Sequence, residues 1–259
     1  MAENSSTNSD TKIAIITGGS RGLGRNTAIA LAKTGVDVIF TYNSNRAEAD
    51  SAVGEIEGLG RKAAALQLDA GNVASFPAFA EEAKAVLAGW GTDRFDFLVN
   101  NAGYQLRGSF GQITEADFDS LTNIHLKGVL FLSQTLVPLM KDGGRIINIS
   151  SGLARFTGPG SMVYGALKGA VEVLTRYMAQ ELGPRGITVN VVAPGAIETD
   201  FGGALIRNNP QVKAHIASIT ALGRTGVADD IGPMIASLLS DANRWVNGQR
   251  IEVSGGMHL

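Results

Sequence analysis

Short apolar runs alternate with longer amphipathic stretches along almost the whole chain, which predicts strands followed by helices. Each run is five to seven residues long, as expected of a buried parallel strand. The expected strands span 12–17, 36–41, 62–68, 95–99, 144–149, 187–193 and 249–253. Because a crossover helix returns the chain to the same edge of a sheet, strands separated by helices run parallel. We therefore expect a doubly wound α/β fold.

The helices are expected between these runs, where apolar residues recur at helical spacing. A first helix carries Ala28, Ile29, Leu31 and Ala32 before Gly35. The others span 46–58, 73–88, 118–140, 164–182 and 228–239. Residues 196–225 have no clean period, and we predict a mobile segment that covers the substrate. The polar residues 1–11 are predicted to be a disordered tail, and residues 12–259 a single domain.

Composition and charge narrow the classes of partner. The 259 residues include 22 basic and 24 acidic side chains, and the net charge of −2 gives no reason to expect nucleic acid or an anionic membrane as partner. The chain has no cysteine, which excludes disulfides, thiol nucleophiles and cysteine-based metal sites. The most apolar stretch, 128–140, is too short and too polar to span a bilayer. We expect a soluble, cytoplasmic protein.

A glycine-rich turn between the first strand and the first helix indicates a phosphate-binding site. Gly18, Gly22 and Gly24 are spaced as GxxxGxG. Glycine lets the backbone approach a phosphate closely, and the free N–H groups at a helix N-terminus attract the anion. The glycines alone also fit an ordinary strand–helix turn, but the strand before them and the helix after them favour a dinucleotide.

The end of the second strand bears on the choice between NAD(H) and NADP(H). An acidic residue there would accept hydrogen bonds from a free 2′-hydroxyl and repel a 2′-phosphate. The residues found there are Thr41, Tyr42, Asn43, Ser44 and Asn45. The first carboxylate is Glu48, and Arg21 and Arg46 suit a phosphate, so we expect NADP(H) rather than NAD(H). Each arginine, taken alone, could equally be a solvated surface charge.

Three residues of the second half predict a carbonyl-binding site. Tyr164 and Lys168 are four residues apart in a predicted helix and share one of its faces, and Ser151 follows the strand 144–149. Reduction of a carbonyl requires a hydride at carbon and a proton at oxygen. A tyrosine with a pKa of about 10 is a poor catalyst near neutrality unless a nearby cation favours its phenolate form.

Together these features resemble the short-chain dehydrogenase/reductase family. The motifs are TGGSRGLG (17–24), NNAG (100–103), Ser151, YGALK (164–168) and Pro194-Gly195. They stand in the family's order and spacing, and the resemblance covers residues 11–256. It implies a three-layer α/β/α Rossmann-type sheet of seven strands, hydride transfer to or from a nicotinamide, and commonly a homotetramer.

The resemblance also implies roles for the catalytic residues. Tyr164 would be the acid in reduction and the base in oxidation, and Ser151 would hydrogen-bond the substrate oxygen. Lys168 would bind the nicotinamide ribose and lower the pKa of Tyr164. A shift from about 10 to about 7 requires roughly 4 kcal/mol, which Lys168 and an oxidised nicotinamide could supply.

The same resemblance gives an expected set of cofactor contacts. These residues are Gly18, Ser20, Arg21, Gly22, Leu23, Gly24, Asn43, Ser44, Asp69, Ala70, Asn101, Ala102, Gly103, Tyr164, Lys168, Pro194, Gly195, Ile197 and Thr199. Asp69 is expected at the adenine, residues 101–103 along the adenosine, and Ile197 and Thr199 at the carboxamide. Ala70 replaces a β-branched apolar residue that is common in the family, so its role is open.

One position departs from the family pattern. The family usually has an asparagine three residues before the glycine of the segment NIHLKG, where this chain has His125. That asparagine holds a water next to the lysine, largely through its main-chain carbonyl. His125 keeps this carbonyl and could relay protons through its imidazole, or it could be a neutral packed residue with the relay left to the backbone. Asn123 is turned about 200° away on a helix and cannot substitute.

Several readings stay open at this point. His215 and His258 lack the spacing of metal ligands, and no metal site is expected. Phe156, Met162 and Phe201 could line the substrate pocket, the core or a subunit interface. The leading prediction is an NADPH-dependent ketone reductase, reversible to an alcohol dehydrogenase, acting on a 3-oxoacyl thioester, a sugar or polyol, or a hydrophobic ketone. The alternative is a nucleotide-binding regulator or scaffold without turnover.

Overall fold

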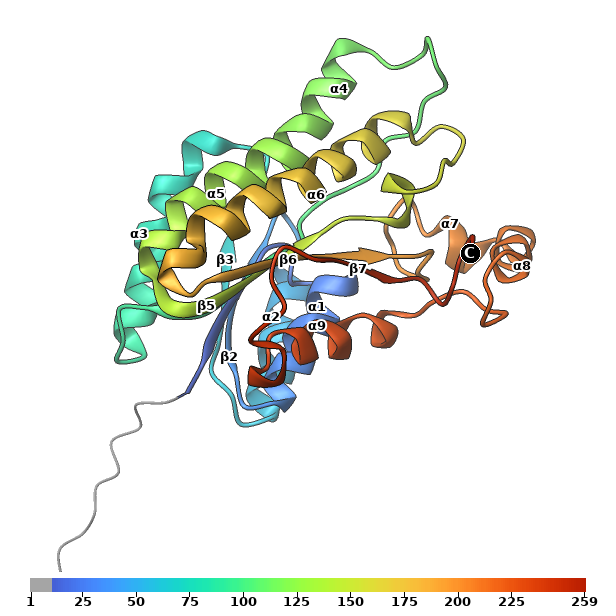
Figure 1. Cartoon of the computed structure of the whole chain (residues 1–259). Helices are drawn as coiled ribbons and strands as arrows, with labels where there is room; N and C mark the ends of the chain where they lie inside the picture. Colours follow the sequence, from blue (N-terminus) through green and yellow to red (C-terminus); the bar gives the residue numbers. More distant parts are fainter. Residues whose placement is uncertain (1–10) are drawn as a thin grey trace, which may run out of the picture.

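Seven parallel strands form one sheet in the order β3-β2-β1-β4-β5-β6-β7 (Figure 1). The structure is a computed structural model and describes residues 11–259. The strands are β1 Ile13–Ile16, β2 Asp37–Tyr42, β3 Ala63–Gln67, β4 Phe95–Asn100, β5 Met140–Ile149, β6 Thr188–Pro194 and β7 Arg250–Val253. The order reverses between β1 and β4, which is the topological switch point where such sheets bind ligands. The predicted doubly wound Rossmann-type fold is confirmed.

Helices cover both faces of this sheet (Figure 1). They are α1 Gly22–Lys33, α2 Arg46–Gly58, α3 Phe76–Gly89, α4 Glu115–Thr122, α5 Gly128–Leu136, α6 Met162–Leu182, α7 Leu205–Asn208, α8 Pro210–Ser218 and α9 Gly232–Leu238. In β1, Ala14 and Ile16 pack with α1, α2 and α9, whereas Ile13 and Ile15 pack with α3, α5 and α6. Alternate side chains of a strand point to opposite faces, so a strand covered on both faces is apolar throughout.

The predicted long helix 118–140 is wrong, because four helical segments of different type and the start of a strand occupy these residues. α4 passes into a π-helical turn, Asn123–Lys127, which leads into α5. The chain then makes a 3₁₀ turn around Pro138, which cannot continue an α-helix, and enters β5 at Met140. The wide π turn adds a residue to the helix without an obvious mark in the apolar pattern, and such turns occur frequently at functional sites.

The segment 196–225 contains the short helices α7 and α8 and is held by ion pairs. Lys213 Nζ lies 2.7 Å from a carboxylate oxygen of Glu198, and Arg224 pairs with Asp230 at the same distance. The mobility of this segment stays a prediction. The predicted tail 1–11 lies outside the described residues except for its last position. No helix in residues 11–259 is long and apolar enough to cross a membrane.

Candidate active site

Ser151, Tyr164 and Lys168 meet at the carboxyl edge of the sheet. Ser151 follows β5, and α6 presents the tyrosine and the lysine from the same face, both of them buried. The Ser151 hydroxyl is within hydrogen-bonding reach of the Tyr164 phenol. Lys168 Nζ donates a hydrogen bond to the main-chain oxygen of Ile149 at 2.7 Å and lies 5.6 Å from the centre of the Tyr164 ring. The lysine is therefore fixed by the last residue of β5.

Burial shifts the pKa values of both side chains so that their uncharged forms are favoured. It raises the pKa of the Tyr164 phenol above its ordinary value, although the hydrogen bond with Ser151 opposes this shift. It lowers the pKa of the Lys168 ammonium to about 7. The sequence predicted a lowered pKa for Tyr164. Desolvation outweighs the hydrogen bond with Ser151, and the phenol is held in its protonated form.

The buried ammonium of Lys168 should make stability depend on pH. Its pKa is about 7 in the folded protein and about 10.4 when unfolded, so the folded state binds fewer protons between these values. Stability should therefore rise by about 2 kcal/mol from pH 7 to pH 9. Urea unfolding of the parent and of Lys168→Met at both pH values measures this difference. An equal pH dependence in the two proteins would show that Lys168 does not titrate in this range.

His125 lies beside Tyr164 within the π-helical turn, and the two rings are edge to face at a centroid distance of 5.1 Å. Its Nε2 lies 2.7 Å from the main-chain oxygen of Tyr104. A carbonyl oxygen only accepts, so Nε2 carries the proton and Nδ1 is an acceptor. Nδ1 is buried and has no partner among the described residues. Burial first, and Lys168 second, lower the pKa of His125 to about 3, which keeps the imidazole neutral.

A neutral imidazole with its Nε2 proton bonded to a carbonyl favours the second interpretation of His125, a packed residue with the relay left to the backbone. We expect His125→Asn to leave the pH–rate profile of ketone reduction unchanged between pH 5 and pH 9, because no imidazolium forms in that range. His125→Phe, which removes both ring nitrogens, should give the same profile at a lower rate. A change of slope near neutral pH in either variant would restore the relay hypothesis.

The glycine turn has the form of a dinucleotide cradle. A methyl carbon on Gly24 would lie 2.1 Å from the oxygen of Gly18, so α1 begins in direct contact with the turn. Gly18 and Gly22 have positive φ values of 67° and 55°, which disfavour other residues. Arg21, the residue before α1, makes no side-chain cap, so the first N–H groups of this twelve-residue helix are available to a pyrophosphate. These features fit a nicotinamide dinucleotide.

Several of the expected cofactor residues surround this turn. Thr199 lies 3.9 Å from the methyl position of Gly22, which brings the carboxyl end of β6 to the phosphate cradle. The amide of Asn101 donates to the main-chain oxygens of Thr17 and Gly18 at 2.9 and 3.1 Å. Its side chain therefore holds the turn to β4.

The other predicted cofactor residues lie along the same edge of the sheet. Ser20 and Ala70 are buried, Leu23 is half-buried, and Ala102 donates its N–H to Thr17. Asp69 accepts from the N–H of Gly71, which fixes the carboxylate just beyond β3. Pro194 ends β6, Gly195 packs against Ser254, and Ile197 bridges to Gly226.

The expected ribose-2′ site lies beyond β2. Asn43 and Ser44 are exposed there. The Arg46 guanidinium is 2.7 Å from Asp50 and 3.5 Å from the Tyr42 hydroxyl. The arginine thus already has a carboxylate partner one turn along α2, and both side chains are largely exposed.

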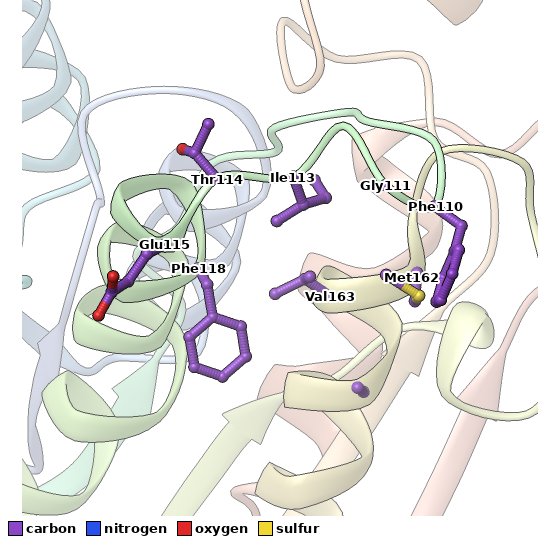
Figure 2. Close-up of a pocket in the computed structure, with 9 residues that line it drawn as sticks. Phe110, Gly111, Ile113, Thr114, Glu115, Phe118, Met162 and Val163 are labelled. Carbon is purple, nitrogen blue, oxygen red and sulfur yellow. The ribbon is translucent and has the colours of Figure 1, made fainter.

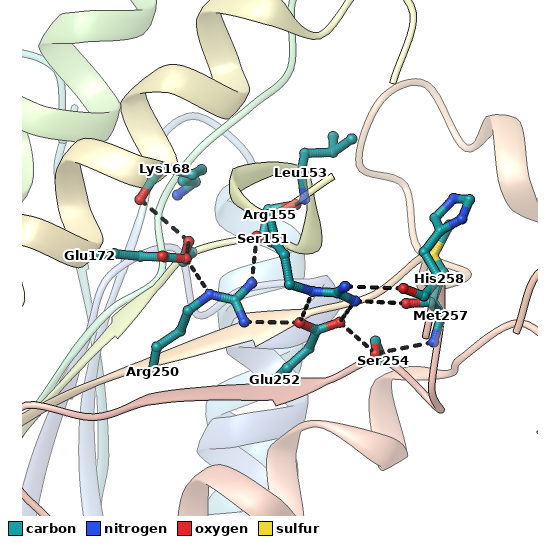
Figure 3. A network of polar contacts seen from close by, with 11 residues as sticks. Ser151, Leu153, Arg155, Lys168, Glu172, Arg250, Glu252, Ser254, Met257 and His258 are labelled. Carbon is teal, nitrogen blue, oxygen red and sulfur yellow. Dashed lines mark hydrogen bonds and ion pairs between the residues drawn. The ribbon is translucent and has the colours of Figure 1, made fainter. Parts of the chain in front are cut away.

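A chain of ion pairs connects the C-terminal residues to the catalytic edge (Figure 3). Arg155 donates a hydrogen bond to each carboxylate oxygen of Glu252 at 2.8 Å, and this contact lowers the pKa of Glu252 to about 2. Arg250 donates to Glu252 at 2.9 Å and to Glu172 on α6 at 2.7 Å. Glu172 also accepts from the Ser150 hydroxyl at 2.7 Å. Arg250 further approaches the main-chain oxygen of Ser151 at 3.5 Å.

The sequence analysis missed this network, although β7 carries a signal for part of it. In the run Arg250-Ile251-Glu252-Val253 the polar residues alternate, which places Arg250 and Glu252 on one face of the strand. Arg155 lies 97 positions before Glu252, and only the fold brings it there. Its guanidinium also donates to the main-chain oxygens of Met257 and His258 at 2.8 and 3.0 Å.

Arg155→Ala should lower the free energy of unfolding measurably, because Glu252 and two C-terminal carbonyls lose their charged hydrogen-bond donor. Arg155→Lys should not restore the stability of the parent, because an ammonium cannot donate two parallel hydrogen bonds to a carboxylate. Urea unfolding provides the measurement. Arg176→Ala is the control, since Arg176 donates to a carbonyl of its own helix. Equal destabilisation by both alanine substitutions would contradict a role for the network.

The three apolar candidates of the sequence lie in different places. Phe201 is next to Tyr164, with ring centroids 5.9 Å apart. Phe156 packs against His258, with ring centroids 4.6 Å apart. Met162 lines an apolar hollow between the α6 N-terminus, α4 and the loop before it, which Figure 2 shows together with Phe110 and Phe118. The hollow includes none of the catalytic candidates.

Comparison with known proteins agrees with this arrangement. A family model described as enoyl-(acyl carrier protein) reductase matches residues 18–258. The 3-oxoacyl-[acyl-carrier-protein] reductase FabG of Staphylococcus aureus is 37% identical over 251 residues, which cover 96% of this chain and 99% of FabG. The tetrahydroxynaphthalene reductase PfmaG of Pestalotiopsis fici is 36% identical over 256 residues, covering 95% of this chain and 91% of PfmaG.

Solved structures give the same result. The angucycline C-6 ketoreductase LanV with bound NADP matches with a TM-score of 0.90 at 35% identity, and the match covers 95% of each chain. Together, the matching motifs, the fold and these relatives show that the chain belongs to the short-chain dehydrogenase/reductase family of oxidoreductases.

Proposed function

We propose that this protein is an NADP(H)-dependent oxidoreductase that reduces a ketone to a secondary alcohol and catalyses the reverse oxidation. The observation that supports this most directly is the group of half-buried Ser151 and buried Tyr164 and Lys168 at the same carboxyl edge of the sheet as the glycine turn. We assign the proton and the charge of the reaction to these side chains, because two hydroxyls and an ammonium come together there.

In this proposal the carbonyl oxygen accepts hydrogen bonds from the hydroxyls of Ser151 and Tyr164. Burial keeps the phenol protonated, so Tyr164 can give its proton to the oxygen as negative charge develops there. NADPH, when bound, supplies the hydride to the carbonyl carbon. Lys168, 5.6 Å from the ring centre, stabilises the phenolate that remains and holds the ribose. The Ile149 carbonyl keeps the ammonium in place.

The preference for NADP(H) rests on the charges beyond β2. The loop offers Asn43 and Ser44 and no carboxylate before Glu48, and the relative LanV has NADP bound. Arg46 is exposed and pairs with Asp50, and an exposed pair of this kind contributes little to stability because water screens it. Arg46 can therefore exchange Asp50 for a 2′-phosphate at small cost, while Arg21 stands at the start of α1.

Consumption of NADPH with a panel of ketones tests the proposed function. We expect turnover with NADPH and a kcat/KM for NADH lower by roughly tenfold or more. Arg21→Ala and Arg46→Ala should each narrow that ratio, whereas Arg25→Ala should not, because Arg25 pairs with Glu55 on α2. NADPH binding without turnover of any ketone would instead favour a non-catalytic regulator. Equal or better use of NADH would contradict the assigned cofactor.

We also propose a homotetramer. Three apolar side chains are exposed on two helices: Phe131 on α5, with 40% of its surface exposed, and Val173 and Tyr177 on α6, with 44% and 65%. α5 and α6 pack against each other through Val129 and Val171, so these side chains lie on neighbouring helices. Exposed apolar side chains on adjacent helices are typical of a subunit interface. Light scattering of the purified protein gives the mass, and a stable monomer would contradict the proposal.

A further inference from the structure

Two loops meet above Tyr164, one after β4 and one after β6. In the first loop, Gln105 Nε2 donates to the Ser161 hydroxyl at 3.0 Å, and Gly108 N donates to the Gly160 oxygen at 3.1 Å. In the second loop, a methyl carbon on Gly202 would lie only 2.9 Å from Gln105 Oε1. The loops thus touch each other and the start of α6, and they form one wall around the catalytic tyrosine.

Each of these loops carries an aromatic residue that is partly exposed. Tyr104 exposes 37% of its surface and Phe201 42%. The Phe201 ring is tilted by 54° against Tyr164 at 5.9 Å, and the Tyr104 ring is tilted by 49° against His125 at 6.1 Å. His125 in turn stands edge-on to Tyr164. Four rings therefore follow one another around the place where the carbonyl is expected.

The two exposed rings are held by hydrogen bonds of their own residues and not by core packing. His125 Nε2 bonds the Tyr104 main-chain oxygen, and the Tyr104 hydroxyl is hydrogen-bonded to Ser120 on α4. The Phe201 N–H donates to the Thr199 hydroxyl at 3.3 Å. Neither ring belongs to a core cluster of the described residues. An aromatic ring that does not pack in the core exposes apolar surface to water, which is unfavourable. A flat apolar ligand that covered the exposed rings of Tyr104 and Phe201 would remove this surface from water.

We propose that the substrate is a ketone joined directly to an aromatic ring, or fused with one, and that this ring lies against Tyr104 and Phe201 while its carbonyl meets Tyr164. The inference rests on the proposed ketone reduction and narrows its substrate class. Neutral His125 forms the edge of the same apolar wall. Stacked or tilted aromatic pairs add stabilisation beyond simple burial, which a saturated ring of the same size does not provide.

A matched pair of ketones tests this inference. Acetophenone and cyclohexyl methyl ketone have the same carbon skeleton, but only the first has an aromatic face. The measured quantity is the ratio of their kcat/KM values, compared between parent and variants so that intrinsic reactivity cancels. Phe201→Leu and Tyr104→Leu should each lower this ratio by roughly fivefold, which corresponds to the loss of one aromatic pair. Phe201→Tyr and Tyr104→Phe keep the rings and should keep the ratio.

Phe110→Leu is the control, because Phe110 is 90% exposed and lines the separate hollow of Figure 2. An unchanged ratio in both leucine variants, or an equal fall in Phe110→Leu, would overturn the inference while leaving ketone reduction intact. Absence of turnover with every ketone in the parent enzyme would refute the proposed function itself. NADPH affinity, measured for each variant, shows whether the variant is folded.

Discussion

Tyr164→Phe should lower kcat for the proposed ketone reduction by about a thousandfold, because it removes the proposed proton donor and leaves the rest of the site in place. Phe fits the buried position of Tyr164 and keeps its ring contacts with His125 and Phe201. The hydroxyl that Ser151 approaches is the only group lost. Because the glycine turn is untouched, the affinity for NADPH should stay within about twofold of the parent value. Stopped-flow measurement of a single turnover isolates the chemical step.

Two further measurements make the result specific. Ser151→Ala should lower kcat by a smaller factor, about a hundredfold, since it removes one of two donors to the carbonyl oxygen. Combined with Tyr164→Phe it should add little, because groups that act on one oxygen are not additive. A Tyr164→Phe enzyme that retained more than a tenth of the parent kcat would assign the proton to another donor.

Gly103→Ala should lower kcat/KM by about a hundredfold, the loss expected when a site is displaced by about 1 Å. A methyl carbon at position 103 would lie 2.5 Å from His125 Cε1 and 3.1 Å from Nδ1. The ring cannot simply turn away, because Nε2 is bonded to the oxygen of Tyr104, the next residue. Relief of the clash therefore moves either the Tyr104 loop or His125, and both border Tyr164.

A second substitution distinguishes this clash from a general effect of alanine. His125→Ala in the Gly103→Ala background removes the atoms that the methyl group meets, so kcat/KM should recover by tenfold or more relative to Gly103→Ala alone. His125→Ala alone should lose activity, because it releases the Tyr104 carbonyl. Purely additive losses in the double variant would show that Gly103 and His125 act independently.

The regular parts of this molecule were predictable because their signals are local. Buried parallel strands have to be apolar throughout, and so the runs around Ile15, Val38 and Leu98 were visible one by one. The glycine turn and the pair Tyr164 and Lys168 could be recognised for the same reason, since turn chemistry and helical spacing involve only neighbouring residues.

The remaining features depend on contacts between distant residues. The π-helical turn around His125 changes the helical period without changing the apolar composition, and neither the neutral state of His125 nor its bond to Tyr104 follows from sequence. The direction of the pKa shift of Tyr164 depends on the balance between burial and nearby charge, which only coordinates provide. The contact between Arg155 and Glu252 joins two segments that no spacing rule connects.

The hydrogen bond from His125 to Tyr104 also provides a spectroscopic reporter. Its Nε2 proton is buried and bonded at 2.7 Å, so it should exchange slowly with solvent and give a resolved imidazole N–H resonance. The other two histidines, His215 and His258, are exposed, and their ring protons should exchange too fast to interfere. Magnetic resonance of ¹⁵N-histidine-labelled protein would then follow ligand binding through a single nitrogen of His125. The ring of this residue has its centroid 5.1 Å from that of Tyr164.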